Sequence, residues 1–334
     1  MSAATDTARW DFPAPFGARS LIVLIAALSL LWYSGQRVEV GRMLALTGQA
    51  ALAQVGLSPR SPVQEGLGTV IGQLFPIQLS ERRETSRIEG FDAAKLPFLS
   101  HLETVETPDE KMNPVTMRME SHPVRTTWLV EPLGYVGHVA VKMLETLEIA
   151  LWGTVVAIAA GWPLAMLGAR NMTPNPVIRA AARAVVGVLR AIPELISALF
   201  LVIAFGFGPI AGFLALGIYG AGFLGKFYAE DMENADPRPQ EALTAMGVRR
   251  MIMWRFAILP QVLPQWIAYT LYILDRNVRM ATVIGIVGAG GIGQELKGRY
   301  DMYEYAHVGT ILIAILLVVL LLDHATARLR KACM

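Results

Sequence analysis

The amino-acid sequence predicts an all-α, polytopic membrane protein with about six transmembrane helices, and three observations carry this prediction. First, 54% of the 334 residues are hydrophobic and only 17% are charged, whereas a soluble domain carries about 25% charged residues. Second, the apolar residues are gathered into runs of the length that crosses a bilayer, about 20 residues per helix. Third, these runs lack the alternation of barrel strands, so helices are the structure that satisfies the backbone in lipid.

The same composition excludes several other classes of protein. A chain this apolar would have too few polar residues to cover the surface of a soluble enzyme. Its single cysteine, Cys333, allows neither an intrachain disulfide nor a cysteine-rich metal site. The net charge of +2 is too small to indicate a nucleic-acid partner. We therefore expect membrane lipid around the chain, no bound metal and no nucleic acid.

The first apolar run, residues 21–33, predicts a transmembrane helix over 20–36. A signal peptide is the alternative, because a run of this length also fits the apolar region of a cleaved leader. The bulky Trp32 and Tyr33 stand where cleavage would need small residues, which favours an uncleaved anchor. Residues 1–19 are then expected to be a cytoplasmic tail.

Residues 37–143 are rich in charge, and we expect them to form an extracytoplasmic segment. The most charged part, 81–131, holds 7 basic and 10 acidic residues together with prolines that break any long helix; we assign it no role. Two apolar stretches, 43–57 and 66–79, fit amphipathic helices lying on the membrane surface. Plain packing within a small extramembrane layer explains these two stretches equally well.

The chain over 144–325 predicts a core of five further transmembrane helices, followed by a cytoplasmic tail over 326–334. Each apolar run has few charges and the length that crosses a hydrocarbon core of roughly 30 Å. The five runs are 146–168, 184–206, 208–227, 263–286 and 306–322.

Basic residues in the short loops predict the orientation, because such loops stay in the cytoplasm. The basic residues that count are Arg170, Arg179, Arg183, Arg249, Arg250, Arg255, Arg328, Arg330 and Lys331. Both termini and the loop 228–261 should therefore be cytoplasmic, and the charged segment 37–143 should lie outside.

A glycine-rich stretch after the fifth predicted span matches the G-x-G-x-x-G fingerprint of dinucleotide-binding folds, but its surroundings do not. That fingerprint needs a βαβ unit with an acidic residue about 20 residues further on. The next apolar run, 311–322, is too long for a strand, so we reject nicotinamide or flavin binding. Two interpretations stay open, namely close helix packing or a turn whose unpaired N–H groups suit an anion. The glycines concerned are Gly288, Gly290, Gly291 and Gly293.

Charged residues inside the spans, together with one asparagine among them, are the best candidates for function, since each charge costs about 2.5–3.5 kcal/mol at the centre of a membrane helix. The candidates are Arg190, Glu194, Asp275, Arg276, Asn277 and Arg279. A spacing of four lets Asp275 pair with Arg279 along one helix face, and Arg190 and Glu194 have the same spacing. Such pairs also fit inert struts between helices. The basic excess in the fifth span favours a pathway for an anion.

The loop between the fourth and fifth spans predicts an elbow of two short helices. Asp236 fits an N-cap with Pro237 at the first helical position, and the first helix should stop at Gly247. A second amphipathic stretch follows and should end at Leu259-Pro260. An apolar stripe over 242–246 is what docking of a helix into a partner's groove requires.

The elbow resembles the E-A-A…G…L-P signature of permease subunits of bacterial ABC importers. The resemblance is carried by Glu241, Ala242, Gly247, Leu259 and Pro260, with departures from the signature at Leu243 and Ala257. Further stretches within 140–330 are similar to permeases of the phosphonate importers, a group that includes phosphite systems. These stretches are LRAIPEL from Leu189, GFGPIAG from Gly206, LGKFYAE from Leu224, and NVRMATVIGIVGAGGIG from Asn277.

The resemblance implies the fold of a type I ABC importer permease, a homodimer, two cytoplasmic ATPase subunits and a periplasmic substrate-binding protein. It implies that this chain is no enzyme and binds no cofactor, because ATP and Mg belong to the partner ATPase. The elbow would dock into a cleft of that ATPase and couple hydrolysis to alternating access. The implied cargo is phosphonate, phosphite or a related phosphorus oxyanion, moved across the bacterial inner membrane.

For this cargo, Arg276 and Arg279 are expected to line the route, Arg190 ranks behind them, and the turn over 288–293 would shape the outer gate. A permease for another small solute, such as an amino acid, would share the elbow. A membrane-embedded oxidoreductase would have to bind a dinucleotide at the glycines. A purely structural membrane protein would have no ATPase partner.

Overall fold

The structure is a computed structural model that describes most of the chain. The described residues are 18–54, 61–88, 91–93, 96–97, 99–112 and 119–333. They fall into two compact units, residues 1–73 and residues 74–334. The expected cytoplasmic tail, 1–19, lies almost wholly outside the described residues.

The first unit consists of helices whose described side chains are largely exposed. α1 (Ala18–Arg37) covers the first predicted span, and its large apolar side chains are exposed, as contact with lipid requires. α2 (Val40–Gln54) and α3 (Pro62–Leu74) lie where the two amphipathic helices were expected. Ser61 caps α3, because its Oγ accepts a hydrogen bond from the Gln64 N–H (3.2 Å). The membrane-surface location of α2 and α3 stays a prediction.

The second unit begins with an antiparallel sheet that the sequence did not predict. β1 (Glu81–Glu84), β2 (His101–Met112) and β3 (Met119–Glu131) are ordered β1-β3-β2. Pro108 and Pro123, two of the prolines that argue against a long helix, stand opposite each other in the β2–β3 hairpin. Proline stops a helix but is tolerated at the edge of a sheet or where its nitrogen faces away from the ladder. The spans themselves are helical, as predicted.

Helices α4 (Gly134–Gly168) and α7 (Pro209–Asn234) form the centre of the bundle that makes up the rest of this unit. A glycine lets them approach closely, because a Cβ at Gly220 would lie 2.6 Å from the Ala157 Cβ. α4 starts well before the predicted run 146–168, so its first turns belong to the segment that was expected to be external.

The predicted third span, 184–206, is not one helix. α5 (Pro176–Ala191) and α6 (Glu194–Phe205) are bent by 89° at a short break. Pro193 causes the break, because it has no N–H and disfavours the helical conformation of the residue before it. Ile192 accordingly has extended backbone angles (φ −83°, ψ 120°).

The elbow consists of α8 (Pro237–Ala245) and α9 (Arg250–Met253), and α10 (Leu259–Gly285) follows through a π-helical turn. Residues 250–285 therefore form one helix, and the expected end at Leu259-Pro260 is wrong. The wider turn accommodates the proline, which lacks an N–H, since the Leu259 N–H donates to the carbonyl oxygen five residues back.

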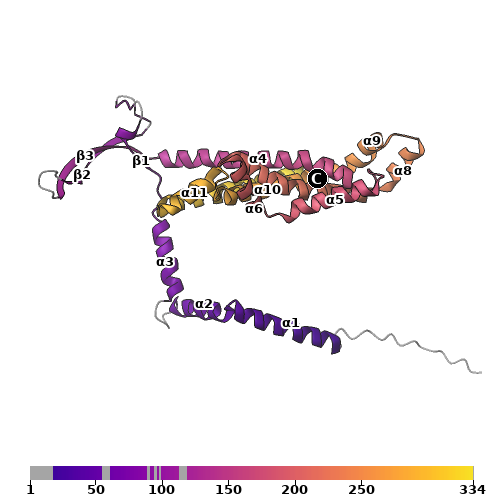
Figure 1. Ribbon diagram of the computed structural model, residues 1–334, viewed down its shortest axis with the longest axis horizontal. Helices are drawn as coiled ribbons and strands as arrows, with labels where there is room; N and C mark the ends of the chain where they lie inside the picture. Colours follow the sequence, from indigo (N-terminus) through magenta and orange to yellow (C-terminus); the bar gives the residue numbers. More distant parts are fainter. Residues whose placement is uncertain are drawn as a thin grey trace, which may run out of the picture. The chain divides into compact units, whose positions relative to one another are not determined.

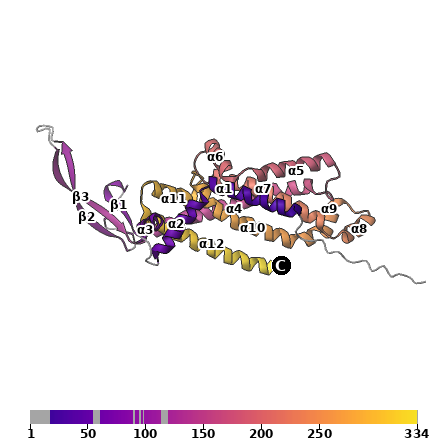
Figure 2. The same ribbon diagram turned by 90° about the horizontal axis from the view of Figure 1, so that it is seen from below.

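The unit ends with α11 (Gly291–Asp301) and α12 (Tyr305–Cys333), which packs beside α10 (Figure 2). Within the described residues, five helices are long and apolar enough to cross a membrane, or six if the bent α5–α6 pair is one span. This agrees with the predicted six. In the second unit, the sheet and the elbow lie at opposite ends of α4 (Figure 1).

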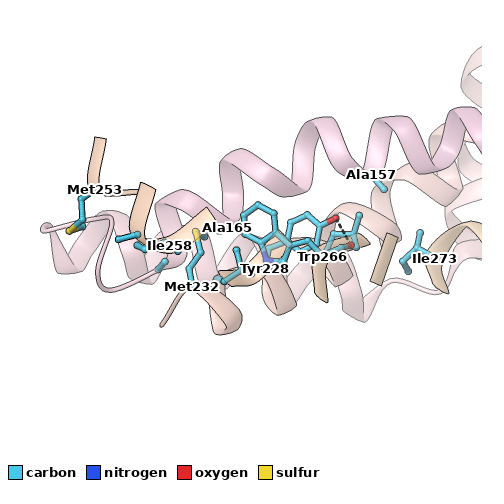
Figure 3. Packing of buried hydrophobic residues seen from close by; sticks show 13 residues of the cluster. Ala157, Ala165, Tyr228, Met232, Met253, Ile258, Trp266 and Ile273 are labelled. Atoms are coloured by element: carbon cyan, nitrogen blue, oxygen red, sulfur yellow. Dashed lines mark hydrogen bonds between the residues drawn. The ribbon is translucent and has the colours of Figure 1, made fainter. Parts of the chain in front are cut away.

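One buried cluster joins α4, α7 and α10 to the elbow (Figure 3). Tyr228 stacks on Trp266 with the ring centroids 4.4 Å apart. Met232, Met253 and Ile258 continue the same cluster toward the elbow. The elbow therefore packs on the core of the bundle. Because such a core is close-packed, a displacement of the elbow also displaces the helices that it contacts.

Candidate functional site

Two charged residues of the spans, Arg276 and Glu194, meet where α6, α7 and α10 come together. Arg276 on α10 forms an ion pair with Glu194 at the start of α6. Its guanidinium also lies over the ring of Tyr219 on α7, 4.0 Å from the ring centroid. The side chains of Arg276 and Glu194 are only 23% and 8% exposed. Pairing explains how an arginine is tolerated here, because an unpaired buried charge is strongly destabilising.

Arg279, one turn further along α10, forms the predicted pair with Asp275, with an Nη2–Oδ2 distance of 2.5 Å. Its Nη1 also reaches Asp323 on α12 at 3.2 Å. The basic excess inferred for the fifth span is therefore cancelled, because Glu194 and Asp323 come from other helices to meet the two arginines of α10.

Asn277 is fully buried and joins α10 to α4, since its Nδ2 donates to the Thr154 Oγ1 at 2.9 Å. Three buried polar atoms around it have no hydrogen-bond partner among the described residues: Asp275 Oδ1, Arg276 Nη1 and Asn277 Oδ1. Buried polar groups are as a rule hydrogen-bonded. These atoms therefore leave bonding capacity for water or for a polar ligand.

Arg190 does not pair with Glu194, although their spacing had suggested it. The bend between α5 and α6 puts the two residues on different helix axes, and Glu194 is paired with Arg276 instead. Arg190 packs against α7, where a Cβ at Gly222 would lie 2.7 Å from the Arg190 Cγ.

The glycine turn before α11 is hydrogen-bonded to side chains of α4. Gly288, Gly290 and Gly291 have φ values of +93°, +85° and +70°, which favour glycine. The N–H of Gly291 donates to the Glu145 Oε1 (3.0 Å), and that of Ile292 donates to the Thr146 Oγ1 (2.8 Å). The interpretation of this turn as a set of unpaired N–H groups is therefore wrong at these two groups, because α4 already supplies a carboxylate and a hydroxyl.

Gly293 supports the interpretation as close packing. A Cβ at this position would collide with the carbonyl oxygen of Thr282 on α10. In the part of the chain that the structure describes, strands occur only between residues 81 and 131. The stretch 283–296 is helix, turn and helix there, whereas the dinucleotide fingerprint needs a strand before its turn.

The elbow presents an exposed outer face. Its exposed residues include Glu241, Ala242, Ala245, Met246 and Gly247. Asp236 is the predicted N-cap, because its carboxylate accepts a hydrogen bond from the Arg238 N–H at 3.0 Å. Gly247 ends α8 with a φ of +71°, a conformation that favours glycine. The predicted apolar stripe is divided, since Leu243 packs on the buried core while Met246 is 70% exposed.

Polar contacts that the sequence did not predict tie the elbow end together. Glu233, at the end of α7, accepts hydrogen bonds from the Arg183 Nη2 and from the Arg170 N–H, both at 2.6 Å. Asn171 donates to the Gln240 Oε1 of α8 at 3.3 Å. The signal for these contacts in the sequence is the cluster of loop arginines, which predicts orientation but not the partners of each arginine.

A second unpredicted network lies at the α11 end. Arg299 contacts Glu295 (2.8 Å) and Glu304 (2.6 Å), and His138 of α4 lies 3.2 Å from Glu295. Burial raises the pKa of Glu295, but hydrogen bonds from Arg299 and His138 outweigh it and hold the pKa below its ordinary value. Within the described residues, no group of three or more His, Cys, Asp or Glu is arranged to hold a metal ion.

Comparisons with known proteins cover the bundle that carries these sites. Residues 157–332 match the family of binding-protein-dependent transport system inner membrane components. The chain is 52% identical over 257 residues to a Stutzerimonas stutzeri protein described as a putative phosphite transport system permease protein, covering 77% of this chain and 98% of that protein. It is 43% identical over 176 residues to the phosphate-import permease protein of Mycolicibacterium smegmatis, covering 53% of this chain and 33% of that protein.

Two solved structures show a similar fold. An inward-facing methionine ABC transporter matches with a TM-score of 0.52 and 24% identity, covering 59% of this chain and 96% of that chain. An amino acid ABC transporter matches with a TM-score of 0.51 and 16% identity, covering 59% and 95% of the two chains. The likeness shows the fold of a type I ABC importer permease, as predicted from the sequence.

Proposed function

The chain belongs to the family of binding-protein-dependent transport system inner membrane components, and on this basis we propose that it imports phosphite, phosphonate or a related phosphorus oxyanion. The observation that carries the proposal is the 52% identity across 98% of the Stutzerimonas stutzeri relative, whose name specifies phosphite transport. The Mycolicibacterium smegmatis relative is named for phosphate import. The shared chemistry of these cargoes is a tetrahedral phosphorus oxyanion.

The chain acts as the permease subunit of an ABC importer in the inner membrane, beside an ATPase and a substrate-binding protein. Two copies form a homodimer, two ATPase subunits bind it from the cytoplasm, and the binding protein delivers the cargo from the periplasm. ATP and Mg stay on the ATPase, so this chain holds no cofactor and performs no covalent chemistry. The family membership and the importer fold support this assembly.

The basic loops support an orientation with both termini and the elbow in the cytoplasm. The sheet lies at the other end of the second unit (Figure 1), which supports an external position for the part of the charged segment that the sheet occupies, residues 81–131. The elbow then faces the ATPase with its exposed residues, while Leu243 is packed on the core. ATP-driven closure of the ATPase would move the elbow, and the shared core would pass that movement to the spans.

Along the route, Arg276 and Arg279 supply positive charge for the oxyanion. Each arginine is paired with a carboxylate, so the cargo would have to replace that carboxylate as the partner of the guanidinium. The unpaired atoms Asp275 Oδ1, Arg276 Nη1 and Asn277 Oδ1 support this position, because they mark incomplete hydrogen bonding at the same level of α10. The turn over 288–293 would shape the outer gate.

The route is tested with Arg279→Gln, which should lower uptake while the complex still assembles. Lys297→Gln is the matched control, because Lys297 forms an exposed pair with Asp301 at the same four-residue spacing, on α11. Normal uptake by Arg279→Gln would show that this arginine is only a strut between α10 and α12.

The cargo is tested by reconstituting the permease with its ATPase and binding protein in proteoliposomes. Phosphite, a phosphonate, phosphate and methionine are supplied in turn, and both ATP hydrolysis and accumulation inside the vesicles are measured. We expect accumulation of phosphorus oxyanions alone. Uptake of the amino acid without the oxyanions would overturn the proposal. The alternative that the cargo is an amino acid is supported by similarity of fold alone, at 24% identity or less.

A further inference from the structure

A cavity of about 250 Å³ lies between α4, α5 and α7 on the elbow side of the bundle. Glycines keep it open, because Gly168, Gly187 and Gly225 line it from the three helices without side chains. A water molecule occupies roughly 30 Å³ in the liquid. The cavity therefore has room for one tetrahedral oxyanion with some of its water, and it is too small for a whole lipid.

The ionisable lining of this cavity is mainly cationic. Arg183, Arg190, Lys226 and Glu230 line it. On α5, residues 183, 187 and 190 follow the i, i+4, i+7 spacing that places side chains on one helix face. The two arginines therefore stand on either side of Gly187, with open space between them, since a Cβ at Gly187 would meet nothing within 4 Å.

Two of the three cations are already paired. The Arg183 Nη2 contacts Glu233 at 2.6 Å, and its Nε donates to the Gly168 carbonyl oxygen at 3.0 Å. Lys226 lies 3.5 Å from Glu230. Arg190 differs from both, because no carboxylate of the described residues lies within ion-pair distance of it, and its buried Nε donates to no acceptor there.

We propose that this cavity is a binding site for a phosphate-type oxyanion, with Arg190 as its principal ligand. A guanidinium matches two oxygens of a tetrahedral oxyanion with parallel hydrogen bonds. An anion also supplies the counter-charge that Arg190 lacks, in a position where an unpaired cation is costly. The site is separate from the arginines of α10, and it does not depend on which cargo the importer carries.

Two sources supply such a group, the headgroup of an anionic phospholipid and a free oxyanion in the cytoplasm. Arg183 lies at the predicted inner boundary of the membrane, and Arg190 is seven residues deeper along α5, about 10 Å at the rise of an α-helix. A headgroup can therefore enter from the inner leaflet and a free ion from the cytoplasm. The phosphate group that reaches Arg190 is chemically the same in both cases.

The test uses the assembled permease and ATPase in nanodiscs, without ATP or binding protein. In one arm the lipid is phosphatidylcholine and the probe is radiolabelled inorganic phosphate. In the other arm phosphatidylglycerol is included, and lipid retained by the complex is counted by native mass spectrometry. Binding in either arm should weaken about tenfold or more in Arg190→Gln, since hydrogen bonds to a charged group are lost.

Two further variants keep the test falsifiable. Gly187→Leu should block binding by filling the cavity without removing charge, and it covers the case in which Arg190→Gln does not fold. Arg179→Gln, on the same helix but outside the cavity, should bind like the wild type. Phosphate binding that responds to the first two variants identifies a free ion, and retained phosphatidylglycerol that responds identifies a headgroup. Binding that neither variant changes, or no binding in either arm, overturns the proposal.

Discussion

Glu194→Gln is the sharpest test of the charged centre, because it removes the only carboxylate that pairs with Arg276 among the described residues. The amide keeps the shape of the side chain but not its charge. Arg276 is then left with the face of Tyr219 and little solvent, since its side chain is 23% exposed. Breaking a buried pair from one side costs about 3–5 kcal/mol, and an arginine at the centre of a membrane helix costs about 2.5–3.5 kcal/mol. We expect a loss of about 3 kcal/mol in the free energy of unfolding.

The assay is equilibrium unfolding of the purified permease in mixed micelles with a rising fraction of SDS, followed by tryptophan fluorescence. Arg276→Gln and the double variant Glu194→Gln/Arg276→Gln complete a double-mutant cycle. The double variant should lose less stability than the sum of the singles, by about 1–3 kcal/mol, because it leaves no unpaired charge. Asp301→Asn, which breaks an exposed pair, should cost under about 1 kcal/mol.

The same variants separate a strut from a pathway residue. If Arg276 only joins helices, the double variant regains both assembly and uptake. If Arg276 meets the cargo, the double variant assembles but does not transport. Two results would refute the reasoning that this pair holds α6 to α10. One is a free energy of unfolding for Glu194→Gln within about 0.5 kcal/mol of the wild type. The other is a double variant whose loss of stability equals the sum of the losses of the two single variants.

Three further variants test the turn, the α11 network and the elbow. Gly293→Ala should lower the stability of the fold by about 1–3 kcal/mol, because the new Cβ meets the Thr282 carbonyl oxygen. Gly298→Ala is the control and should cost nothing, because a Cβ there meets no other atom within 4 Å. Equal melting temperatures of the two variants would contradict the close packing at Gly293. The pKa of Glu295 is held below its ordinary 4.5. The stability that the ionised Glu295 contributes to the folded protein is therefore fully present above about pH 4.5 and is lost as the pH falls further. Glu295→Gln should flatten that part of the stability–pH curve, and an unchanged curve would exclude this carboxylate as the cause. Gly247→Ala strains an exposed turn by about 1 kcal/mol, so the bundle should fold while ATP-driven uptake falls; full uptake would argue against a role of the elbow in coupling.

Much of the architecture could be predicted because it depends on local pattern. Apolar runs of membrane-crossing length predicted the spans, and the N-cap at Asp236 and the glycine at 247 predicted α8. The same locality explains two errors. Pro260 was expected to end a helix, but a π-helical turn carries the helix through it. Residues 184–206 were expected to form one span, but the helix breaks at Pro193, and the size of the bend, 89°, depends on what the flanking helices pack against.

The charge pairs show where sequence reasoning stops. Spacing along one helix correctly predicted Asp275 with Arg279, because residues four apart share a helix face. It failed for Arg190 and Glu194, because the bend separates them. No local pattern could reveal that Glu194 meets Arg276, 82 residues further along the chain. Nor could it show that the N–H groups of the glycine turn are already bonded to α4.

The sequence by itself determined that the chain is a bundle of membrane-crossing helices with an elbow of two short helices, because hydrophobic runs, caps and glycines act over a few residues. The tertiary structure alone decided which charges are neutralised, and it places Arg190 beside a cavity with no carboxylate of the described residues within ion-pair distance. The physical reason is that a buried charge is stabilised by whatever lies within a few ångströms of it. In a helical bundle, those neighbours come from helices far apart in the sequence.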